Sequence, residues 1–316
     1  MNEILNQNRK LLLSVAISIL IGFTFGIICY HERGLIFPGP GDFNMALDFA
    51  DALLKGEDPY NFIPSSIRIG VPLPVAFFGF PFLLIPGRLA AAIFFGISSF
   101  LLAFGILLKG KKWQLLIFTT FPFIYALIFA QWSPIITASW FFPLLAPLLV
   151  LVKPNIALPI AINRITKPGI ILAAIILLIS LLVYPTWPLR WLQMTGDYEY
   201  IIPLFTLPFG PLLLLSLIFW YDPRARLLLG MSLVPIRGAY DLLPLWLIPQ
   251  SRKQMLGLVL LSLVVPVLDL GAAFQVKPLW IVPVLYIPAL SFIFISQWPS
   301  FLAFKEIFLL EKILMV

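Results

Sequence analysis

The sequence predicts an all-α protein, a polytopic bundle of transmembrane helices that forms a single integral membrane domain over residues 1–316. Of the 316 residues 61% are hydrophobic and only 11% are charged, and the mean hydropathy is +1.03. A water-exposed surface carries about 25% charged residues, so most of this surface must face lipid or other helices. The apolar runs are continuous over roughly twenty residues, which favours helices over the alternating strands of a membrane β-barrel.

The length of the apolar runs predicts about nine to eleven membrane segments, because a spanning helix needs roughly 17 to 25 residues. The candidate segments are 11–30, 71–86, 89–108, 113–130, 134–152, 169–185, 201–220, 227–249, 255–273 and 279–297.

The first segment, 11–30, follows Arg9 and Lys10. It is longer than the apolar core of a signal peptide, which has about 7 to 15 residues, so we expect a signal anchor and first span. The basic pair is expected to keep the N-terminus in the cytoplasm.

Proline predicts interruptions in this bundle. The chain has 29 prolines, far above the average of about 5%, and freed carbonyls inside a membrane must line cavities. Segments 71–86 and 134–152 carry several prolines each and are expected to be broken or re-entrant. The stretch 300–316 mixes charges with Phe and Leu and predicts an interfacial amphipathic helix.

The topology has two solutions. If 71–86 crossed fully, Lys109, Lys111 and Lys112 would lie outside, against the positive-inside tendency. Either this segment dips in and returns, or the tendency is overridden locally. The first solution places Gln131 on the same face as Asp42.

The large hydrophilic region, residues 31–70, is expected to form an outer loop. It holds six of the fourteen carboxylates, namely Glu32, Asp42, Asp48, Asp51, Glu57 and Asp58. Residues 43–55 have the spacing of a short juxtamembrane helix with Asp48 and Asp51 on its polar side. The residues expected to lie on the membrane are Met45, Leu47, Phe49, Ala52 and Leu53.

Five residues are expected to shape this loop. Gly56 ends the short helix and Pro59 prevents its continuation. Asp58 initiates a turn before Tyr60, and Gly41 precedes Asp42.

The composition excludes several chemistries. With His31 as the single histidine and Cys29 as the single cysteine, catalytic triads, thiolate clusters and multi-histidine metal sites are nearly excluded. We predict no metal and no cofactor. The net charge of +7 comes from small basic clusters between apolar runs, a pattern typical of membrane topology and not of nucleic-acid binding.

Carboxylates, lysines and arginines remain as chemical groups. Carboxylates in a loop above a lipid-lined cavity suit the deprotonation of a hydroxyl that attacks an activated sugar carbon. Basic side chains can hold a lipid-phosphate leaving group.

Three segments carry a family resemblance. "GDFNMALDFADALLKGEDPY" (41–60), followed by "VPLPVAFFGFPFLLIP" (71–86), resembles the first outer loop and next helix of glycosyltransferase family 87, the polyprenol-phosphate-mannose-dependent mannosyltransferases with the GT-C membrane fold. "FAQWSPIITASW" (129–140), leading into "VKPNIALPI" (152–160), is similar to that family's Gly-Gln stretch and Lys-Pro, with Ala130 in place of the usual glycine. "AYDLLPLWLIP" (239–249) resembles its Tyr-Asp-Leu helix.

The resemblance implies an inverting transfer of a hexose, mannose first, from a polyprenyl-phosphate sugar to a lipid, glycan or protein acceptor outside the cytoplasm. Asp42 matches the acidic base of the first outer loop in GT-C enzymes. We expect a multi-pass protein of a prokaryotic plasma membrane, with its site on the outer face. The partners are the donor, the acceptor and membrane lipids, without nucleic acid.

Four further residues are candidates for substrate binding. Arg237 and Asp241 lie four residues apart in an apolar segment, and intramembrane charges normally face a bundle interior. In this scheme Arg237 and Lys153 bind the phosphate, Asp241 orients Arg237, and Gln131 lines the cavity. Each also has a structural interpretation: an ion pair for Arg237 and Asp241, snorkelling for Lys153, and interhelical hydrogen bonding for Gln131.

A rival class stays open. Broken helices and midplane charges are also features of transporters, so a lipid-linked-sugar transporter or a structural subunit of a membrane complex is the alternative. The sequence has no visible inverted repeat, and its dense carboxylate cluster lies in a loop. In loop 186–200, Trp187, Trp191, Tyr198 and Tyr200 either stack on a sugar or anchor the chain at the interface.

Overall fold

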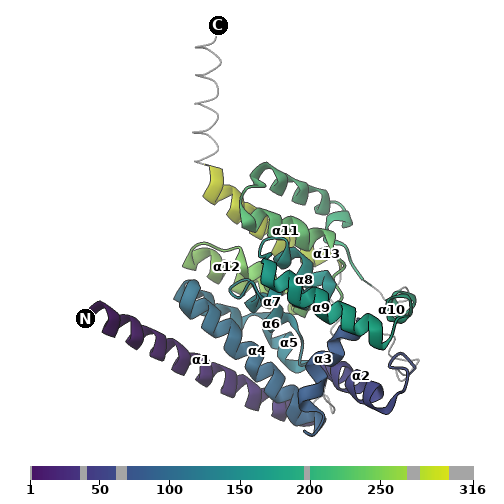
Figure 1. Cartoon of the computed structure of the whole chain (residues 1–316). Helices are drawn as coiled ribbons and strands as arrows, with labels where there is room; N and C mark the ends of the chain where they lie inside the picture. Colours follow the sequence, from purple (N-terminus) through teal and green to yellow (C-terminus); the bar gives the residue numbers. More distant parts are fainter. Residues whose placement is uncertain (1, 36–40, 62–69, 196–199, 269–277, 299–316) are drawn as a thin grey trace.

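The computed structural model describes residues 2–35, 41–61, 70–195, 200–268 and 278–298, and the regular structure of these ranges is helical (Figure 1). An isolated antiparallel bridge joins Ile201 to Ile236. The all-α class is confirmed. Within the described residues two helices are long and apolar enough to cross a membrane, or three if the bent pair α9 and α10 counts as one span. The larger number of membrane segments stays a prediction, and the helix expected at 300–316 lies outside the described residues.

The two long helices are α1 (Asn2–Leu35) and α4 (Gly87–Lys109), which pack antiparallel. Their backbones meet at glycines: a Cβ on Gly22 would lie 2.7 Å from the carbonyl oxygen of Gly96. Small residues allow such an approach between membrane helices. The predicted bounds of 11–30 were too narrow, because no proline interrupts the polar flanks before Pro38 and the helix continues through them.

The two proline-rich segments that were expected to be broken differ from each other. Segment 71–86 contains one short apolar helix, Leu73–Phe82, in which η2 (Leu73–Val75), α3 (Ala76–Gly79) and η3 (Phe80–Phe82) follow one another without a break. The predicted break is absent from this helix, and the re-entrant alternative stays a prediction. Segment 134–152 is broken, as predicted, into α6 (Ser133–Ala138) and α7 (Leu145–Val150).

Three spans that were expected to be continuous are not. Segment 201–220 divides into η5 (Pro203–Phe205) and η6 (Gly210–Phe219). Segment 113–130 divides into η4 (Lys112–Thr119) and α5 (Phe121–Ile128), because Thr120 accepts a hydrogen bond from the amide of Phe123 and starts a new helix. Segment 227–249 divides into α11 (Pro223–Leu233) and η7 (Ala239–Leu247) across an extended stretch.

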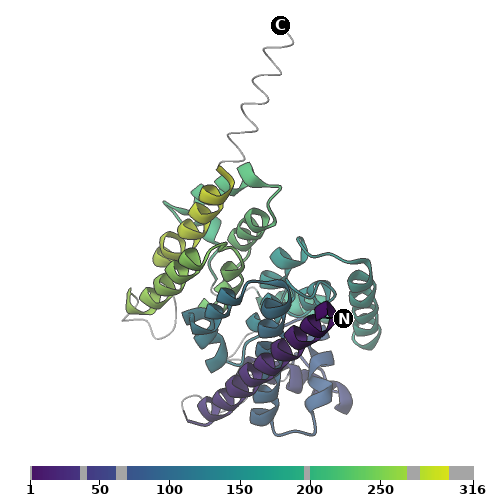
Figure 2. The ribbon, with the colours of Figure 1, turned by 90° about the vertical axis from the view of Figure 1, so that its left-hand side faces the viewer.

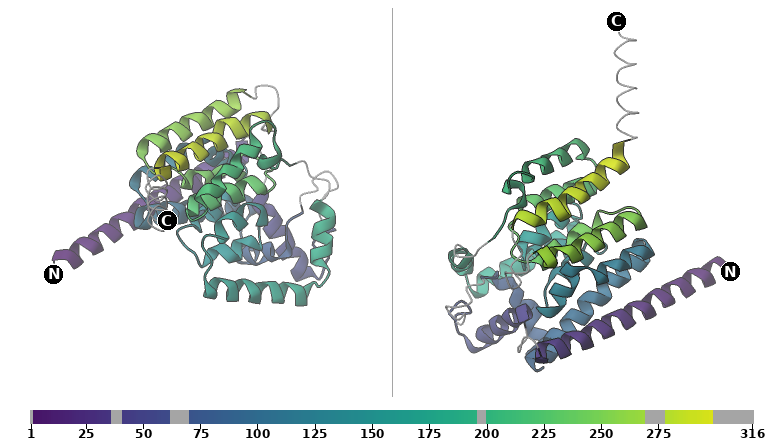
Figure 3. Two further views of the ribbon diagram at one scale, coloured as in Figure 1. Left: turned by 90° about the horizontal axis from the view of Figure 1, so that it is seen from above. Right: turned by 180° about the vertical axis from the view of Figure 1, so that it is seen from behind.

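The loop expected at 186–200 is also wrong in part, since Trp187–Thr195 form α10. This helix lies at 96° to α9 (Lys167–Val183), and Figure 3 shows the sharp change of direction. Proline is tolerated in a first helical turn, so Pro188 does not prevent the helix. The remaining elements are η1 (Gly41–Phe43), α2 (Asn44–Lys55), α8 (Pro154–Ala161), α12 (Arg252–Leu268), α13 (Pro278–Ile281) and η8 (Val282–Tyr286), after which the chain stays helical to Trp298.

The antiparallel pair fixes the sidedness of the bundle. Arg88 Nε donates to the carbonyl of Tyr30 at 2.6 Å, so the start of α4 lies beside the end of α1. Lys109, at the other end of α4, therefore lies toward the end of α1 that carries Arg9 and Lys10. The chain between α1 and α4 therefore leaves and re-enters this pair at the same end, and both topological solutions stay predictions.

Four basic side chains lie near one another at turns between helices, and we call this part of the bundle the basic end: Lys109, Lys111, Arg164 and Arg226. Lys109 Nζ donates to the carbonyl of Phe141 at 2.7 Å, and Lys111 Nζ donates to that of Gln250 at 3.3 Å. Arg226 Nε donates to Asn163 at 2.8 Å, and the Arg164 guanidinium lies 4.2 Å from the Trp140 ring centre. A further link joins Asp222, paired with Arg224, to Gln297. Figure 2 views the bundle from the side of the N-terminus, with α1 in front and α12 beside residues 278–298.

The apolar face of α2 packs on protein and not on the membrane, so that part of the prediction is wrong. Leu47 and Phe49 are buried, and a Cβ on Gly79 of α3 would lie 1.9 Å from the carbonyl oxygen of Ala46. The helical stretch Leu73–Phe82 covers this face of α2. The helix bounds of 43–55 are confirmed within one residue.

Candidate functional site

Asp42 is held where the chain enters α2. Gly41 has a positive φ of 66°, a conformation that glycine adopts without cost. The amide of Asp42 donates to the carbonyl of Phe129 at 2.9 Å, which ties this turn to the end of α5. Phe43 is fully buried and stacks on Phe94 at 4.2 Å between ring centres. The carboxylate therefore stands on a fixed backbone.

Gln131 is positioned by the C-terminal cap of α5. Ala130 has a φ of 49°, its amide donates to Leu127 at 3.2 Å, and the amide of Gln131 donates to Ala126 at 2.9 Å. This is the Schellman arrangement, whose left-handed position usually carries glycine. The cap turns Gln131, which is 1% exposed, toward η1, where its Nε2 donates to the Asp42 carboxylate.

A buried ion pair stands behind Gln131. Lys153 Nζ lies 2.8 Å from Asp241 Oδ1 and donates to Gln131 Oε1 at 3.0 Å. Asp241 has no exposed surface; its Oδ2 accepts from the amide of Arg237 at 3.1 Å and from Asn155 Nδ2 at 3.3 Å. The ammonium of Lys153 also lies 4.5 Å from the centre of the Tyr240 ring.

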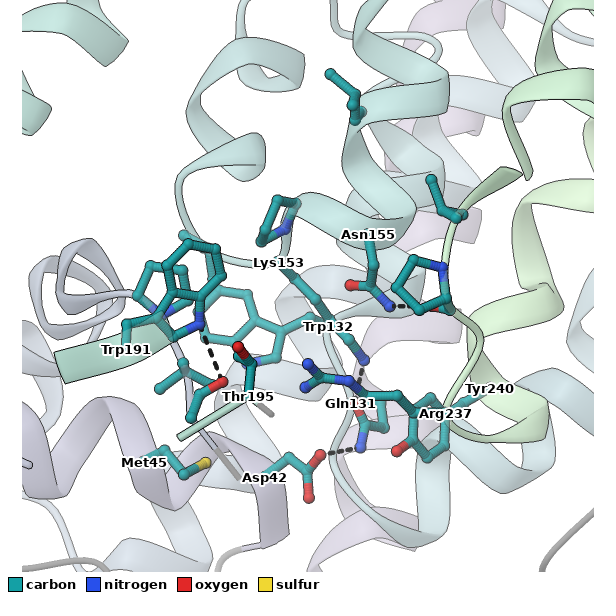
Figure 4. A pocket seen from close by; sticks show the side chains of 18 residues that line it. Asp42, Met45, Gln131, Trp132, Lys153, Asn155, Trp191, Thr195, Arg237 and Tyr240 are labelled. Atoms are coloured by element: carbon teal, nitrogen blue, oxygen red, sulfur yellow. Dashed lines mark hydrogen bonds between the residues drawn. The ribbon is translucent and has the colours of Figure 1, made fainter. Parts of the chain in front are cut away.

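These side chains form one wall of a cavity of about 340 Å³ (Figure 4). Asp42, Gln131, Lys153, Asn155 and Arg237 supply the polar wall. The rest of the lining is mainly apolar and includes Met45, Val71, Pro72, Trp132, Trp191 and Thr195. In Figure 4, Met45, Trp191 and Thr195 form a facing wall across from Lys153 and Arg237. Polar groups of both charges thus face an aromatic surface.

Helix α10 contributes part of the facing wall and is anchored at two points. Arg190 pairs with Asp58 at 3.1 Å, and Trp191 Nε1 donates to the carbonyl of Gly70 at 3.3 Å. Leu189 and Leu192 are exposed on the opposite side of the helix.

The loop-shaping predictions are consistent with the geometry. Gly56 ends α2 with a φ of 70°. Asp58 Oδ1 accepts from the amide of Tyr60 at 2.9 Å, which makes the expected turn around the buried Pro59. Tyr60 donates its hydroxyl hydrogen to Val71 at 3.1 Å, and burial raises the pKa of this phenol well above its ordinary value.

Arg237 and Asp241 do not share a helix face. Arg237 and Asp241 were expected on one face of a span, but Arg237 precedes η7 and bonds Asp241 through its backbone amide. The ion-pair partner of Asp241 is Lys153, which is 14% exposed and so does not extend to the headgroups. The sequence contained no signal for this pairing, because the two residues come from segments far apart in the chain.

Several lining residues were missed. Asn155 and Tyr240 stand beside Lys153 and Asp241 in the quoted motifs, so the motifs themselves could have indicated them. Met45 was assigned to the membrane, and Thr195 carried no recognisable signal. Trp191 was considered for sugar stacking, with interfacial anchoring as the alternative.

No group of three or more His, Cys, Asp and Glu side chains within the described ranges is arranged to hold a metal ion. The available chemistry is that of a carboxylate acceptor, two cations, two amides and an aromatic wall. Comparison with models of known protein families, with functionally characterised proteins and with solved structures found no match.

Proposed function

We propose that this chain is a GT-C type glycosyltransferase similar to family 87. It transfers a hexose, with mannose as the first candidate, from a polyprenyl phosphate to a lipid, glycan or protein acceptor. The observation that carries the proposal is the position of Asp42: a first-loop carboxylate that lines a cavity also lined by Arg237 and Trp191. No soluble nucleotide-sugar donor and no cofactor enter this scheme.

The proposed step is a single displacement. Asp42 accepts the proton of the acceptor hydroxyl while the hydroxyl oxygen forms a bond to the anomeric carbon of the sugar. The bond from that carbon to the phosphate oxygen breaks, and the polyprenyl phosphate leaves with the electron pair. Arg237 offsets the negative charge on the phosphate, and its fork geometry suits phosphate oxygens. Attack opposite the leaving group inverts the anomeric configuration.

The aromatic wall supports a sugar substrate. The side chain of Trp191 is half-buried, and its indole Nε1 bonds to the carbonyl of Gly70. An indole face fixed in this way offers an apolar surface to the C–H face of a pyranose, opposite the polar groups that bind hydroxyls.

The membrane arrangement belongs to the same proposal. Helices α1 and α4 cross singly, the broken segments cross in pairs or dip, and the basic end faces the cytoplasm of a prokaryotic cell. The rise of α11, an 11-residue helix that leads from Asp222 toward Arg237, places the cavity about 16 Å from the basic end. The reaction then occurs toward the outer face.

A transfer assay tests the proposal. Purified protein in lipid is given radiolabelled polyprenyl-phosphate mannose and a membrane extract as the acceptor pool. Asp42→Asn is expected to lower transfer by about 10²–10⁴-fold, the usual contribution of a general base. Asp51→Asn, which removes an exposed carboxylate of α2, is the matched control and is expected to retain activity.

Full transfer by Asp42→Asn would show that another group is the base. If neither protein transfers any of a panel of lipid-linked sugars, the enzyme proposal is wrong. Movement of the labelled lipid across the vesicle bilayer would then support the transporter alternative, and no movement would support a structural subunit.

A further inference from the structure

The transfer step proposed above gives no role to the buried Lys153–Asp241 ion pair. We propose that Asp241 is a positioning residue that acts on Asp42 through Lys153 and Gln131. This inference rests on the proposed function for its effect on rate. Its physical content is a four-residue relay that fixes the direction of one buried amide.

The relay depends on the direction in which the Gln131 side-chain amide points. A glutamine amide has a donor end and an acceptor end, and only the donor end can bond to a carboxylate. Here Nε2 faces Asp42 while Oε1 accepts from Lys153 Nζ at 3.0 Å. Because Gln131 is 1% exposed, water cannot easily replace either bond, and a reversed amide would set two like groups against each other at both ends.

Lys153 can hold the acceptor end only while its own charge is balanced. The side chain is 14% exposed, and its counter-charge is Asp241 at 2.8 Å. The other oxygen of Asp241 accepts from the amide of Arg237 and from Asn155, so the carboxylate is itself held on its second side. The Tyr240 ring flanks the ammonium at 4.5 Å. The ion pair is therefore part of the scaffold, and the phosphate contact falls to Arg237.

The relay has a consequence for the pH dependence of transfer. A fixed hydrogen bond to a carboxylate favours its charged form. Among the described residues that line the cavity with Asp42, the charged and titratable side chains include Arg237, Lys153 and Tyr240, and Asp241 lies behind Lys153. Removing the ion pair keeps Arg237 in place but releases the Gln131 amide, so the acidic limb of the rate profile should move to higher pH.

The test removes both charges together. Asp241→Asn alone leaves Lys153 buried without its counter-charge and endangers folding, whereas Lys153→Met/Asp241→Asn leaves no uncompensated charge. In this double variant kcat is expected to fall at least about tenfold, with KM within about twofold, because the base is misplaced while Arg237, to which the phosphate contact is assigned, and the apolar lining remain. The acidic limb should rise by about one pH unit, given the strength of a hydrogen bond to a charged group.

Two variants complete the kinetic series. Asp241→Glu keeps the carboxylate and is expected to restore most of the wild-type pH profile. Lys55→Met/Asp51→Asn removes an exposed ion pair on α2 with the same chemistry and should leave kcat and the pH profile unchanged. An unchanged kcat and pH profile in Lys153→Met/Asp241→Asn would overturn the relay.

A stability measurement separates the relay from the proposed reaction. The change in Tm caused by Asp42→Asn should differ by about 2 °C or more between the wild-type background and Lys153→Met/Asp241→Asn, since members of one hydrogen-bond network are non-additive. In the Lys55→Met/Asp51→Asn background the effects should add. If wild-type protein transfers no sugar yet the coupling is present, the relay stands and the proposed function fails; additive effects in both backgrounds would refute the relay.

Discussion

Replacing Gly79 by alanine is expected to push α2 away from α3 and to displace Asp42 with it. The new Cβ would lie 1.9 Å from the carbonyl oxygen of Ala46 and 2.4 Å from its carbonyl carbon. Both obstacles are backbone atoms of α2, so no side-chain rotation relieves them. Gly79 has a helical φ of −79°, and the effect is therefore purely steric.

The magnitude follows from the distance. A relaxed C···O contact is about 3.3 Å, whereas the new Cβ would lie 1.9 Å from the Ala46 oxygen. The two backbones must therefore move apart by roughly 1.4 Å, the difference between these distances. Overpacking of a tight core costs typically about 1–3 kcal/mol, and the rigid obstacle places this variant near the upper value. For a chain of this size that corresponds to a fall in Tm of about 4–5 °C. A shift of about 1 Å at the base also lowers the transfer rate about 10²-fold.

Thermal unfolding in detergent measures the first effect, and the transfer assay measures the second. Gly257→Ala is the matched control, because Gly257 lies in α12 and a Cβ there meets nothing within 4 Å. That variant should keep or slightly raise Tm, since alanine favours a helix over glycine. Equal Tm values for Gly79→Ala and Gly257→Ala would refute the packing argument.

Two further predictions concern the surroundings of the site. Ala130→Gly should raise Tm by a degree or two, because the left-handed conformation at φ 49° costs alanine about 1–2 kcal/mol that is only partly offset by the greater freedom of glycine in the unfolded chain; a lower Tm would contradict this account of the cap. Desolvation is the larger cause, and the charge of Asp51 the smaller one, of a pKa of Asp48 that lies above its ordinary value. The folded state therefore favours the neutral carboxyl group. The stability that this neutral group contributes is lost as pH rises through the folded-state pKa. Asp48 is exposed, so solvent screens most of this effect. Asp48→Asn should therefore raise Tm only slightly at pH 7, with the gain vanishing below about pH 4, the unfolded-state range; a gain that is equal at both pH values would contradict the sign.

Local signals predicted the parts of the site that depend on neighbouring residues. The bounds of α2, its end at Gly56 and the turn at Asp58 follow from helix propensity and turn chemistry within a few positions. The break in segment 134–152 followed from its prolines. In each case the physical cause lies in the segment itself.

Pairings between distant segments could not be predicted in the same way. The ion pair of Lys153 with Asp241 depends on how α8 and η7 pack, and hydropathy carries no information on that packing. The prediction instead paired Asp241 with Arg237, its neighbour in sequence. The split of 113–130 at Thr120 was missed because its mean hydropathy is that of a continuous span, and the capping bond to Phe123 outweighs it.

The separation of charge along the bundle also affects how the chain responds to voltage. Lys109, Lys111, Arg164 and Arg226 lie at the basic end, whereas Asp42 lies at the opposite side of α8 and α11. In the proposed topology, inverting the molecule in a membrane at 100 mV would carry each of these four cations through about 2.3 kcal/mol, whereas Arg88, at the other end of the pair, would move in the opposite direction. For a carboxylate at the other end, such as Asp42, the electrical work has the same sign as for the four cations, because both its charge and its direction of movement are reversed. In that topology, an energised membrane favours the orientation in which the basic end faces its negative side, by an amount set by the difference in charge between the two ends.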